Sequence, residues 1–266
     1  MAGEQRDIVW IASYPKSGNT WVRFLACNLL YGPQQSASAL NALAPDIHES
    51  GRQLVTAAYR GLVKTHFAYS PELPLAQRTA AAIQIVRDPA DVLASNFHYA
   101  RRRGDDLGDA RTAFDRYVEA FILHRGDPRW IRFGMGTWEE NVTSWLEARH
   151  KFPVLSLKYE DMAANPRQAC RSLAQLLRPT ASPDEIEQAI ANSTFERMRE
   201  VEDADIRDKR IGIFYKPYLQ ESIDSGLRFM RRGAPGEGAA RLNPKQRAGM
   251  AAAFRPLLSQ LGYSHY

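Results

Sequence analysis

Short apolar, β-branched runs alternate with helical patterns along this 266-residue chain, and no other feature constrains its fold as strongly. The strand candidates are residues 7–14, 61–66, 81–87 and 152–161. The helix candidates are residues 20–32, 90–100, 137–150, 165–179, 182–200 and 243–263, the last of them broken near Pro256. Strand followed by helix, repeated, is typical of α/β proteins. The pattern therefore predicts one domain over residues 1–266, a mostly parallel sheet with helices on both faces.

Two stretches, residues 100–113 and 203–244, interrupt this alternation. The first is rich in charged residues. The second is long and lacks hydrophobic periodicity. Long irregular segments in compact domains often act as lids or binding loops. We therefore expect both stretches to be irregular and to serve binding.

The composition favours anionic partners. The formal net charge is +5, which does not choose among phosphate cofactors, nucleic acid and membrane surfaces. No apolar run approaches the roughly 20 residues that span a bilayer, and the N-terminus lacks a signal-type apolar core, so we expect a cytoplasmic protein without a membrane partner. Cys27 and Cys170 lack metal-binding spacing and are predicted to be buried free thiols.

Polar side chains gather where the predicted strands end. Ligands bind beyond the carboxyl ends of the strands in open α/β sheets. Residues 16–20, His66, Arg87 and residues 159–161 all stand at such ends. We expect these four groups to meet at one site.

The sequence "WIASYPKSGNTW" at residues 10–21 joins the first strand to the first helix through a tight loop. Free N–H groups and the helix dipole make such a junction a ready anion site. Lys16 adds a full charge, and further side-chain donors are Ser17, Asn19 and Thr20. The loop therefore suits a phosphate or a sulfate.

Three other interpretations remain open on these residues. The loop does not match the nucleotide pattern G-x-x-x-x-G-K-[ST], because Lys16 precedes Gly18 by two residues. Ser17 and Asp161 could still hold Mg²⁺, which leaves a P-loop-like kinase using Mg-ATP as the alternative. A polar turn that caps a helix is the purely structural interpretation. A nucleic-acid-binding module, suggested by residues 101–103, lacks interleaved aromatic residues and a fold signature, so no nucleic-acid partner is expected.

The segment "YPKSGNTW" resembles the 5′-phosphosulfate loop of the cytosolic-type sulfotransferases, usually written Y-P-K-S-G-T-T-W. Those enzymes use 3′-phosphoadenosine 5′-phosphosulfate (PAPS). Further segments resemble the family in the same order, from residue 10 to about 236: "VKTHF", "IVRDPADVLASNFHY", "GTWEENVTSWLE", "VLSLKYEDMAANP", "STFERM" and "FMRRGAPG". The resemblance implies the P-loop-like sulfotransferase fold. It also implies transfer of the sulfuryl group of PAPS to a hydroxyl of a small molecule.

Departures from the family pattern occur late in the chain. The usual Arg-Lys-Gly-x-x-Gly-Asp-Trp is here Arg231-Arg232-Gly233 followed by Gly236 and Glu237, so the Asp-Trp is lost. We find no copy of the short C-terminal dimer motif of the animal enzymes. A homodimer is therefore left open, and its usual mode is not expected.

The resemblance assigns the chemistry to three residues. His66 is the candidate general base, which would take the proton of the acceptor hydroxyl as that oxygen attacks sulfur. Lys16 would stabilise charge on the bridging oxygen, and Lys64 would be a second cation on the sulfuryl group. No metal is required if cations of the protein neutralise the leaving phosphate.

The same resemblance assigns the PAPS-binding residues. Arg87, Ser95 and the late Arg231-Arg232-Gly233 would hold the 3′-phosphate, while Trp21 and Phe195 would enclose the adenine. The full predicted set is Lys16, Ser17, Gly18, Asn19, Thr20, Trp21, Arg87, Ser95, Tyr159, Ser193, Phe195, Met198, Phe229, Met230, Arg231, Arg232 and Gly233.

The acceptor pocket would be lined by the variable stretches around residues 33–60, 67–76, 100–135 and 203–227. These stretches contain aromatic side chains such as Phe67, Tyr69, Trp130 and Phe214. An apolar or aromatic acceptor is therefore predicted.

Overall fold

The computed structural model describes residues 6–48 and 61–263, and over these residues it contains one four-stranded parallel sheet in the order β2-β1-β3-β4. The strands are β1 (Ile8–Ser13), β2 (Gly61–Thr65), β3 (Thr79–Val86) and β4 (Val154–Lys158). Buried β-branched and apolar side chains dominate β1 and β3, as expected for strands covered on both faces. The predicted parallel α/β sheet is confirmed.

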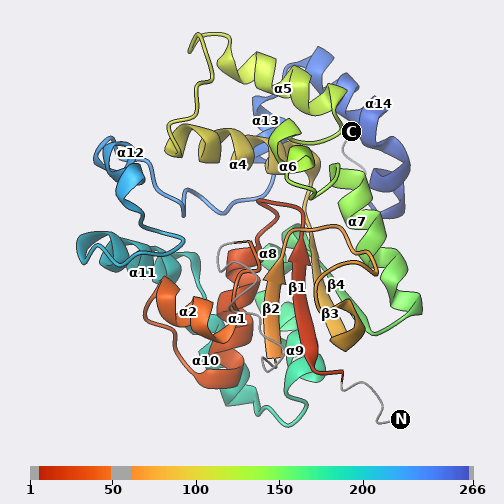
Figure 1. Cartoon of the computed structure of the whole chain (residues 1–266), viewed down its shortest axis with the longest axis vertical. Coiled ribbons are helices and arrows are strands. Elements are labelled where there is room, and N and C mark those ends of the chain that lie inside the picture. Colours follow the sequence, from red (N-terminus) through yellow and green to blue (C-terminus); the bar gives the residue numbers. More distant parts are fainter. Residues whose placement is uncertain (1–5, 49–60, 264–266) are drawn as a thin grey trace.

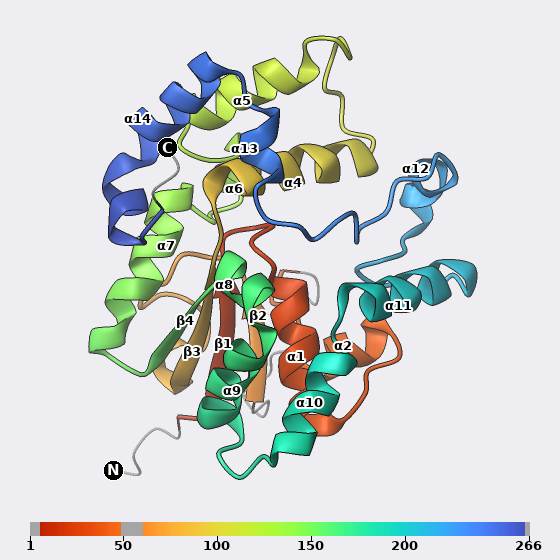
Figure 2. The same cartoon turned by 180° about the vertical axis from the view of Figure 1, so that it is seen from behind.

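Helices cover both faces of this sheet (Figures 1 and 2). Alternate side chains of β1 point to opposite faces: Ile11 packs with Phe24, whereas Trp10 packs with Trp145. The helices on the Ile11 side are α1 (Asn19–Tyr31), α9 (Pro166–Leu177) and α10 (Pro183–Ala191). Helix α7 (Trp138–Glu147) lies on the Trp10 side.

A further group of helices lies beyond the carboxyl ends of the strands (Figure 2). It consists of α4 (Pro89–Arg102), α5 (Ala113–Leu123), α6 (Pro128–Arg132), α13 (Glu237–Arg241) and α14 (Pro244–Gln260). Their shared core includes Phe121 and Phe254, which are fully buried. Helix α4 begins as predicted, because the Asp88 side chain accepts from the N–H groups of Ala90 and Asp91.

The remaining elements are helices and 3₁₀ turns that stand between those already named. They are α2 (Ala37–Leu43), α8 (Tyr159–Ala164), α11 (Phe195–Arg207), α12 (Gln220–Asp224) and the 3₁₀ turns η1 (Ala76–Arg78), η2 (Ala148–His150) and η3 (Pro217–Leu219). Within the described residues, no helix combines the length and the apolar character needed to span a membrane.

Three predicted element boundaries are wrong. The helix expected over residues 182–200 is two helices, because Ser193 donates to the carbonyl of Ala189 and Thr194 starts α11 as its N-cap. The strand expected over residues 152–161 ends at Lys158, where α8 begins. Helix α14 continues through Pro256, since its neighbours Phe254 and Leu257 are packed in the core.

The expectation of an irregular stretch over residues 203–244 is also wrong in part. Helix α11 extends to Arg207, and α12 and α13 follow within the stretch. The chain between α12 and α13 is without helix or strand and runs from the α11 side of the molecule to the α4 side (Figure 2). Of the first stretch, residues 103–112 lie outside helices and strands, as expected.

Candidate functional site

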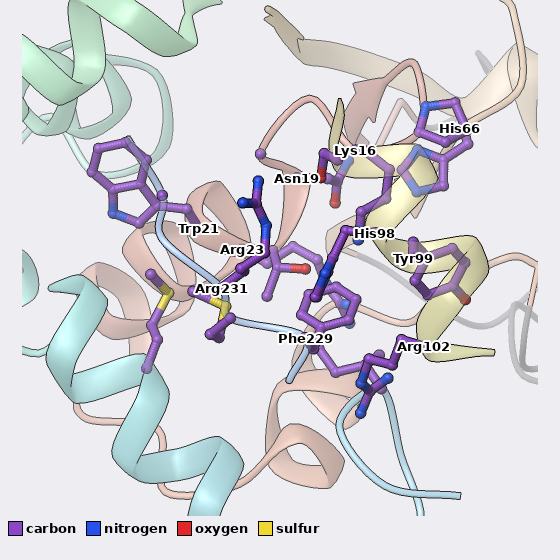
Figure 3. A pocket seen from close by; sticks show the side chains of 18 of the residues that line it. Lys16, Asn19, Trp21, Arg23, His66, His98, Tyr99, Arg102, Phe229 and Arg231 are labelled. Atoms are coloured by element: carbon purple, nitrogen blue, oxygen red, sulfur yellow. The ribbon is translucent and has the colours of Figure 1, made fainter. Parts of the chain in front are cut away.

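A cavity of about 320 Å³ opens beyond the carboxyl ends of β1, β2 and β3. Trp21 lies on the opposite side of this cavity from His66 and Tyr99 (Figure 3). The predicted site residues that line it are Lys16, Gly18, Asn19, Thr20, Trp21, Lys64, His66, Arg87, Ser95, Tyr159, Phe195, Met198, Phe229, Met230, Arg231, Arg232 and Gly233. The four strand-end groups therefore meet at one site.

Two predicted residues, Ser17 and Ser193, are not part of this lining. Ser17 is buried in the β1–α1 loop. The Ser193 hydroxyl donates to the Ala189 carbonyl at 2.7 Å and accepts from Asn28 Nδ2 at 2.8 Å. Ser193 thus ties α10 to α1 instead of facing the cavity.

The β1–α1 loop owes its shape to two left-handed residues. Lys16 has φ 73° and Gly18 has φ 103°, and α1 begins directly after Gly18. Asn19 Nδ2 donates to the Ile11 carbonyl at 3.0 Å and to Ser13 Oγ at 3.2 Å, so this side chain braces the loop against β1. The left-handed turn leaves the start of α1 facing the cavity.

Lys16 is the cation at the centre of the loop. Its Nζ lies 4.0 Å from the centre of the Phe229 ring and 4.5 Å from the centre of the Tyr99 ring. Burial lowers the pKa of Lys16 to about 7, and the charges of Arg102, Arg87 and Lys64 act in the same direction. An anion bound here would be attracted by all of these cations.

Arg87 and Tyr159 form the cavity wall beside Gly18. The Arg87 guanidinium carbon lies 4.1 Å from the centre of the Tyr159 ring, and the Tyr159 hydroxyl donates to the Gly233 carbonyl at 2.6 Å. A Cβ on Gly18 would lie 2.5 Å from the Tyr159 ring, and a Cβ on Gly233 would lie 2.8 Å from the Phe195 ring. Both glycines therefore allow close approach of backbone to aromatic rings.

Two buried carboxylates hold residues 229–238, the late segment that closes the cavity. Glu202 accepts from the N–H groups of Phe229 at 2.6 Å and of Met230 at 2.8 Å. Asp91 accepts from the N–H groups of Gly236 at 2.8 Å and of Gly238 at 2.6 Å. Each end of the segment is thereby fixed through its backbone.

His66 follows β2 and reaches the cavity with a defined tautomer. Its Nδ1 lies 2.8 Å from the Ser13 carbonyl, which can only accept, so Nδ1 carries the proton and Nε2 keeps its lone pair. Burial, then the charges of Lys64 and His48, lower the pKa of His66 well below 6.5. His66 is therefore neutral at neutral pH.

Several cavity residues were missed in the sequence. His98, Tyr99 and Arg102 lie on α4 at helical spacing after Ser95, and this periodicity could have identified them. Asp46 and His48 come from a short segment beside β2, which has no periodic signal. Arg23, on the first helix, and Lys216 are further cations among the missed residues.

The residues that line the cavity fit PAPS, the expected ligand, which is anionic at both ends. Within residues 6–48 and 61–263, the buried Ser17 Oγ and Arg87 Nε have no hydrogen-bond partner. Both are donors, and both stand beside cavity-lining cations. Buried polar groups are normally paired, so these two donors are available to a ligand with acceptor oxygens.

Comparison with known proteins agrees with this chemistry. Residues 6–262 match the family model of the Sulfotransferase domain. The chain is 27% identical over 212 residues to Sulfotransferase 1B1 of Canis lupus familiaris, covering 73% of this chain and 67% of that protein. It is 26% identical over 246 residues to Sulfotransferase 1A1 of Rattus norvegicus, covering 87% of this chain and 77% of the relative.

Solved structures share the fold. Mouse sulfotransferase SULT7A1 complexed with PAP superposes with a TM-score of 0.70 at 21% identity, covering 98% of this chain and 87% of that chain. Retinol dehydratase in complex with androsterone and inactive cofactor PAP superposes with a TM-score of 0.67 at 20% identity, covering 96% of this chain and 81% of that one. Since the family model matches nearly the whole sequence, the chain belongs to the sulfotransferase family, and it is a PAPS-dependent enzyme that transfers a sulfuryl group to small-molecule acceptors.

Proposed function

We propose that the enzyme transfers the sulfuryl group in line to an acceptor hydroxyl, with His66 as the general base. The observation that carries this proposal is the hydrogen bond that His66 Nδ1 donates to the Ser13 carbonyl. It leaves the Nε2 lone pair of a neutral imidazole as the proton acceptor at the cavity. The lowered pKa of His66 keeps the base unprotonated at neutral pH. Lys16 and Lys64 line the same cavity and complete the set of groups that the reaction needs.

PAPS supplies the sulfuryl group on a phosphate leaving group. His66 Nε2 would receive the hydroxyl proton of the acceptor while the acceptor oxygen forms its bond to sulfur. Lys16 would stabilise the negative charge on the bridging oxygen as the old S–O bond breaks, and Lys64 would bind a sulfuryl oxygen. The side chains thereby supply both the base and the charge stabilisation.

The rest of the cavity would bind the donor. Arg87, Ser95, Arg231 and Arg232 are proposed 3′-phosphate ligands, supported by their place on the cavity wall and by the unpaired Nε of Arg87 among the described residues. Gly233 would bind the 3′-phosphate beside Arg231 and Arg232. Trp21, Phe195, Met198 and Tyr159 would surround the adenine, with Phe229 and Met230 closing over it. Ser17, Gly18 and Thr20 would bind the 5′ end. Asn19 and Ser193 would act indirectly. Asn19 would brace the β1–α1 loop, and Ser193 would tie α10 to α1.

The acceptor is proposed to be apolar or aromatic. Tyr99, Trp130 and Met135 line the cavity, and Figure 3 shows Tyr99 on the His66 side. Aromatic and thioether walls bind apolar rings by close packing. Incubation of the enzyme with PAPS and a panel of phenols, alkyl alcohols and sugars, read by mass spectrometry, should give sulfated phenols or apolar alcohols. Sulfation of the sugars alone would refute the proposal.

We further propose that the chain works as one domain, because the cavity walls come from segments between Pro15 and Glu237. The buried free thiols of Cys27 and Cys170 support the predicted cytoplasmic location, since such thiols persist in reducing compartments. A homodimer stays a prediction, and light scattering on the purified protein would decide it.

His66→Ala tests the base directly. The variant should lose turnover by at least about 100-fold, as expected for removal of a positioned general base, while its Kd for PAP changes little. His150→Ala is the matched control, because His150 is exposed and remote from the cavity lining. Turnover that survives in His66→Ala at the level of His150→Ala would place the base elsewhere.

A further inference from the structure

Residues 45–48 run beside the edge strand β2 just before the cavity. The Lys64 N–H donates to the Pro45 carbonyl at 2.9 Å, and the Ile47 N–H donates to the Lys64 carbonyl at 3.2 Å. Asp46 and Lys64 form a parallel β-bridge in this pairing. The short segment therefore brings Asp46 level with Lys64 and His48 level with His66.

Asp46 uses both of its carboxylate oxygens within this pairing. Oδ2 accepts from Lys64 Nζ at 2.5 Å, and Oδ1 accepts from the His48 N–H at 2.9 Å. Asp46 is 3% exposed, and burial alone would raise its pKa. The charges of Lys64 and His66 and the Lys64 hydrogen bond outweigh burial and hold the pKa of Asp46 below its usual range. Asp46 is thus an ionised partner of Lys64.

His48 contacts His66 through backbone and ring. The His66 N–H donates to His48 Nε2 at 2.8 Å. The two rings stack with their centres 5.6 Å apart at an interplanar angle of 23°. Burial and the Lys64 charge lower the pKa of His48 to about 4, so its imidazole is neutral and Nε2 can accept this bond.

We propose that Asp46 and His48 are positioning residues for sulfuryl transfer, Asp46 by holding the Lys64 ammonium at the reacting end of the cavity and His48 by fixing the backbone of His66. This inference rests on the roles proposed above for Lys64 and His66. Neither residue needs to touch the reacting atoms. Both act through the residue beside them on β2.

Such positioning is needed because Lys64 stands among like charges. Lys64 and Lys16 repel each other within the same cavity, and a lysine side chain has many rotamers that would relieve this repulsion. The Asp46 carboxylate favours the one rotamer that keeps Nζ at its side. Misplacement of a reacting group by about 1 Å can cost about 100-fold in rate, so a fixed ammonium is worth much more than a mobile one.

The first test is a double-mutant cycle of Asp46→Asn and Lys64→Met. Asp46→Asn should lower kcat by about 10- to 100-fold, since Lys64 loses its anchor, and leave the Kd for PAP within about threefold. In the Lys64→Met background, Asp46→Asn should cause no further loss, because Asp46 acts through Lys64. The proposal would be overturned if the fold-losses in kcat of the two single variants multiply in the double variant, or if kcat is unchanged in Asp46→Asn.

The pH profile separates positioning from a purely structural role. The Asp46 charge raises the pKa of His66, so Asp46→Asn should move the acid limb of kcat/KM to lower pH. Asp7→Asn is the matched control, because Asp7 pairs with Arg78 at 2.7 Å at the amino ends of β1 and β3. It should leave both kcat and the profile unchanged. An unmoved acid limb in Asp46→Asn counts against the proposal.

The second test concerns His48 and does not depend on Asp46 variants folding. His48→Gln can still accept from the His66 N–H through its amide oxygen, whereas His48→Phe keeps only the stacked ring. His48→Gln should therefore retain at least about tenfold more kcat than His48→Phe, a gap that matches one lost hydrogen bond. Equal kcat values would refute the role of His48. If His66→Ala instead keeps its turnover, the base assignment fails, while the cycle at Lys64 still decides the role of Asp46.

Discussion

Lys16 carries a charge that depends on pH near neutrality. Its pKa of about 7 means that a substantial part of the free enzyme holds a neutral Lys16 at pH 7. In the proposed site, binding of PAP would add negative charge beside Nζ and raise this pKa, so the complex would hold more protons than the free enzyme above about pH 7. Binding should therefore take up a proton at about pH 8, and the affinity should fall by up to about tenfold per pH unit. Calorimetry in two buffers of different ionisation enthalpy measures this uptake.

Lys16→Met should remove the proton uptake. Lys151→Met, at an exposed lysine outside the cavity lining, should leave it in place. Ionisation of the phosphate groups themselves occurs near pH 6 and is therefore complete under these conditions. Equal proton uptake in Lys16→Met and in the unchanged enzyme would contradict the assignment.

His66 should remain a competent base at pH values where an ordinary histidine is protonated. Its pKa lies well below 6.5, and only the neutral form accepts a proton, so activity is retained as the pH falls through 6.5. The profile of kcat/KM for PAPS reports groups of the free enzyme, and its acid limb should have a midpoint below 6.5. A midpoint at or above that value would mean that another group limits the acid side.

At the scale of elements, the turn between β1 and α1 depends on the missing side chain of Gly18. An alanine there meets a left-handed φ of 103° and a Cβ position 2.5 Å from the Tyr159 ring. The combination of backbone strain and overpacking should lower the free energy of unfolding by about 2–4 kcal/mol. Displacement of the Tyr159 ring should also weaken PAP binding, because Arg87 stacks on that ring.

Gly226→Ala is the matched control for Gly18→Ala. Gly226 has φ 84° with no atom within 4 Å of its Cβ position among the described residues. The free energy of unfolding of Gly226→Ala should therefore fall only by the strain of a left-handed alanine, about 1–2 kcal/mol. Urea unfolding and calorimetry with PAP measure both effects. Equal losses of stability and of PAP affinity in the two variants would show that the Tyr159 contact does not matter.

The late segment depends on Asp91, which receives two backbone N–H groups and lies 3.5 Å from the Arg87 guanidinium. Asp91→Asn presents an NH₂ group to one of these N–H donors and removes the charge beside Arg87. The Kd for PAP should rise about 10- to 100-fold, as expected for the loss of one or two charged hydrogen bonds. The Kd for adenosine 5′-phosphate, which has no 3′-phosphate, should change far less. Asp224→Asn on α12 is the control, and an equal effect on both nucleotides would contradict this role.

At the scale of the whole molecule, the sequence was sufficient for the sheet and for most of the site. Apolar β-branched runs predict the four strands, and parallel order brings the residues at their ends together whatever their distance in sequence. Residues whose place depends on one tertiary contact were missed. Asp46 pairs with a residue that is 18 positions away through a single bridge, which leaves no local pattern. The break between α10 and α11 was missed because a back-bond from Ser193, rather than proline or glycine, ends α10.

The cavity joins parts of the molecule that are far apart in sequence, so a bound donor should stabilise the fold as a whole. Its walls include the β1–α1 loop, α4, the start of α11 and the late segment. At about 100 times its Kd, PAP should add about 2.7 kcal/mol to the free energy of unfolding. For a chain of this size, that corresponds to a rise in Tm of roughly 5–10 °C. Mg-ATP lacks the 3′-phosphate, and in an oligonucleotide the 3′- and 5′-phosphates are esterified to neighbouring nucleotides, so each should shift Tm much less. Arg87→Met is the matched variant, since removal of this proposed 3′-phosphate ligand should bring the PAP shift down to that of adenosine 5′-phosphate. Stabilisation by Mg-ATP or by an oligonucleotide in place of PAP would contradict the assigned donor site.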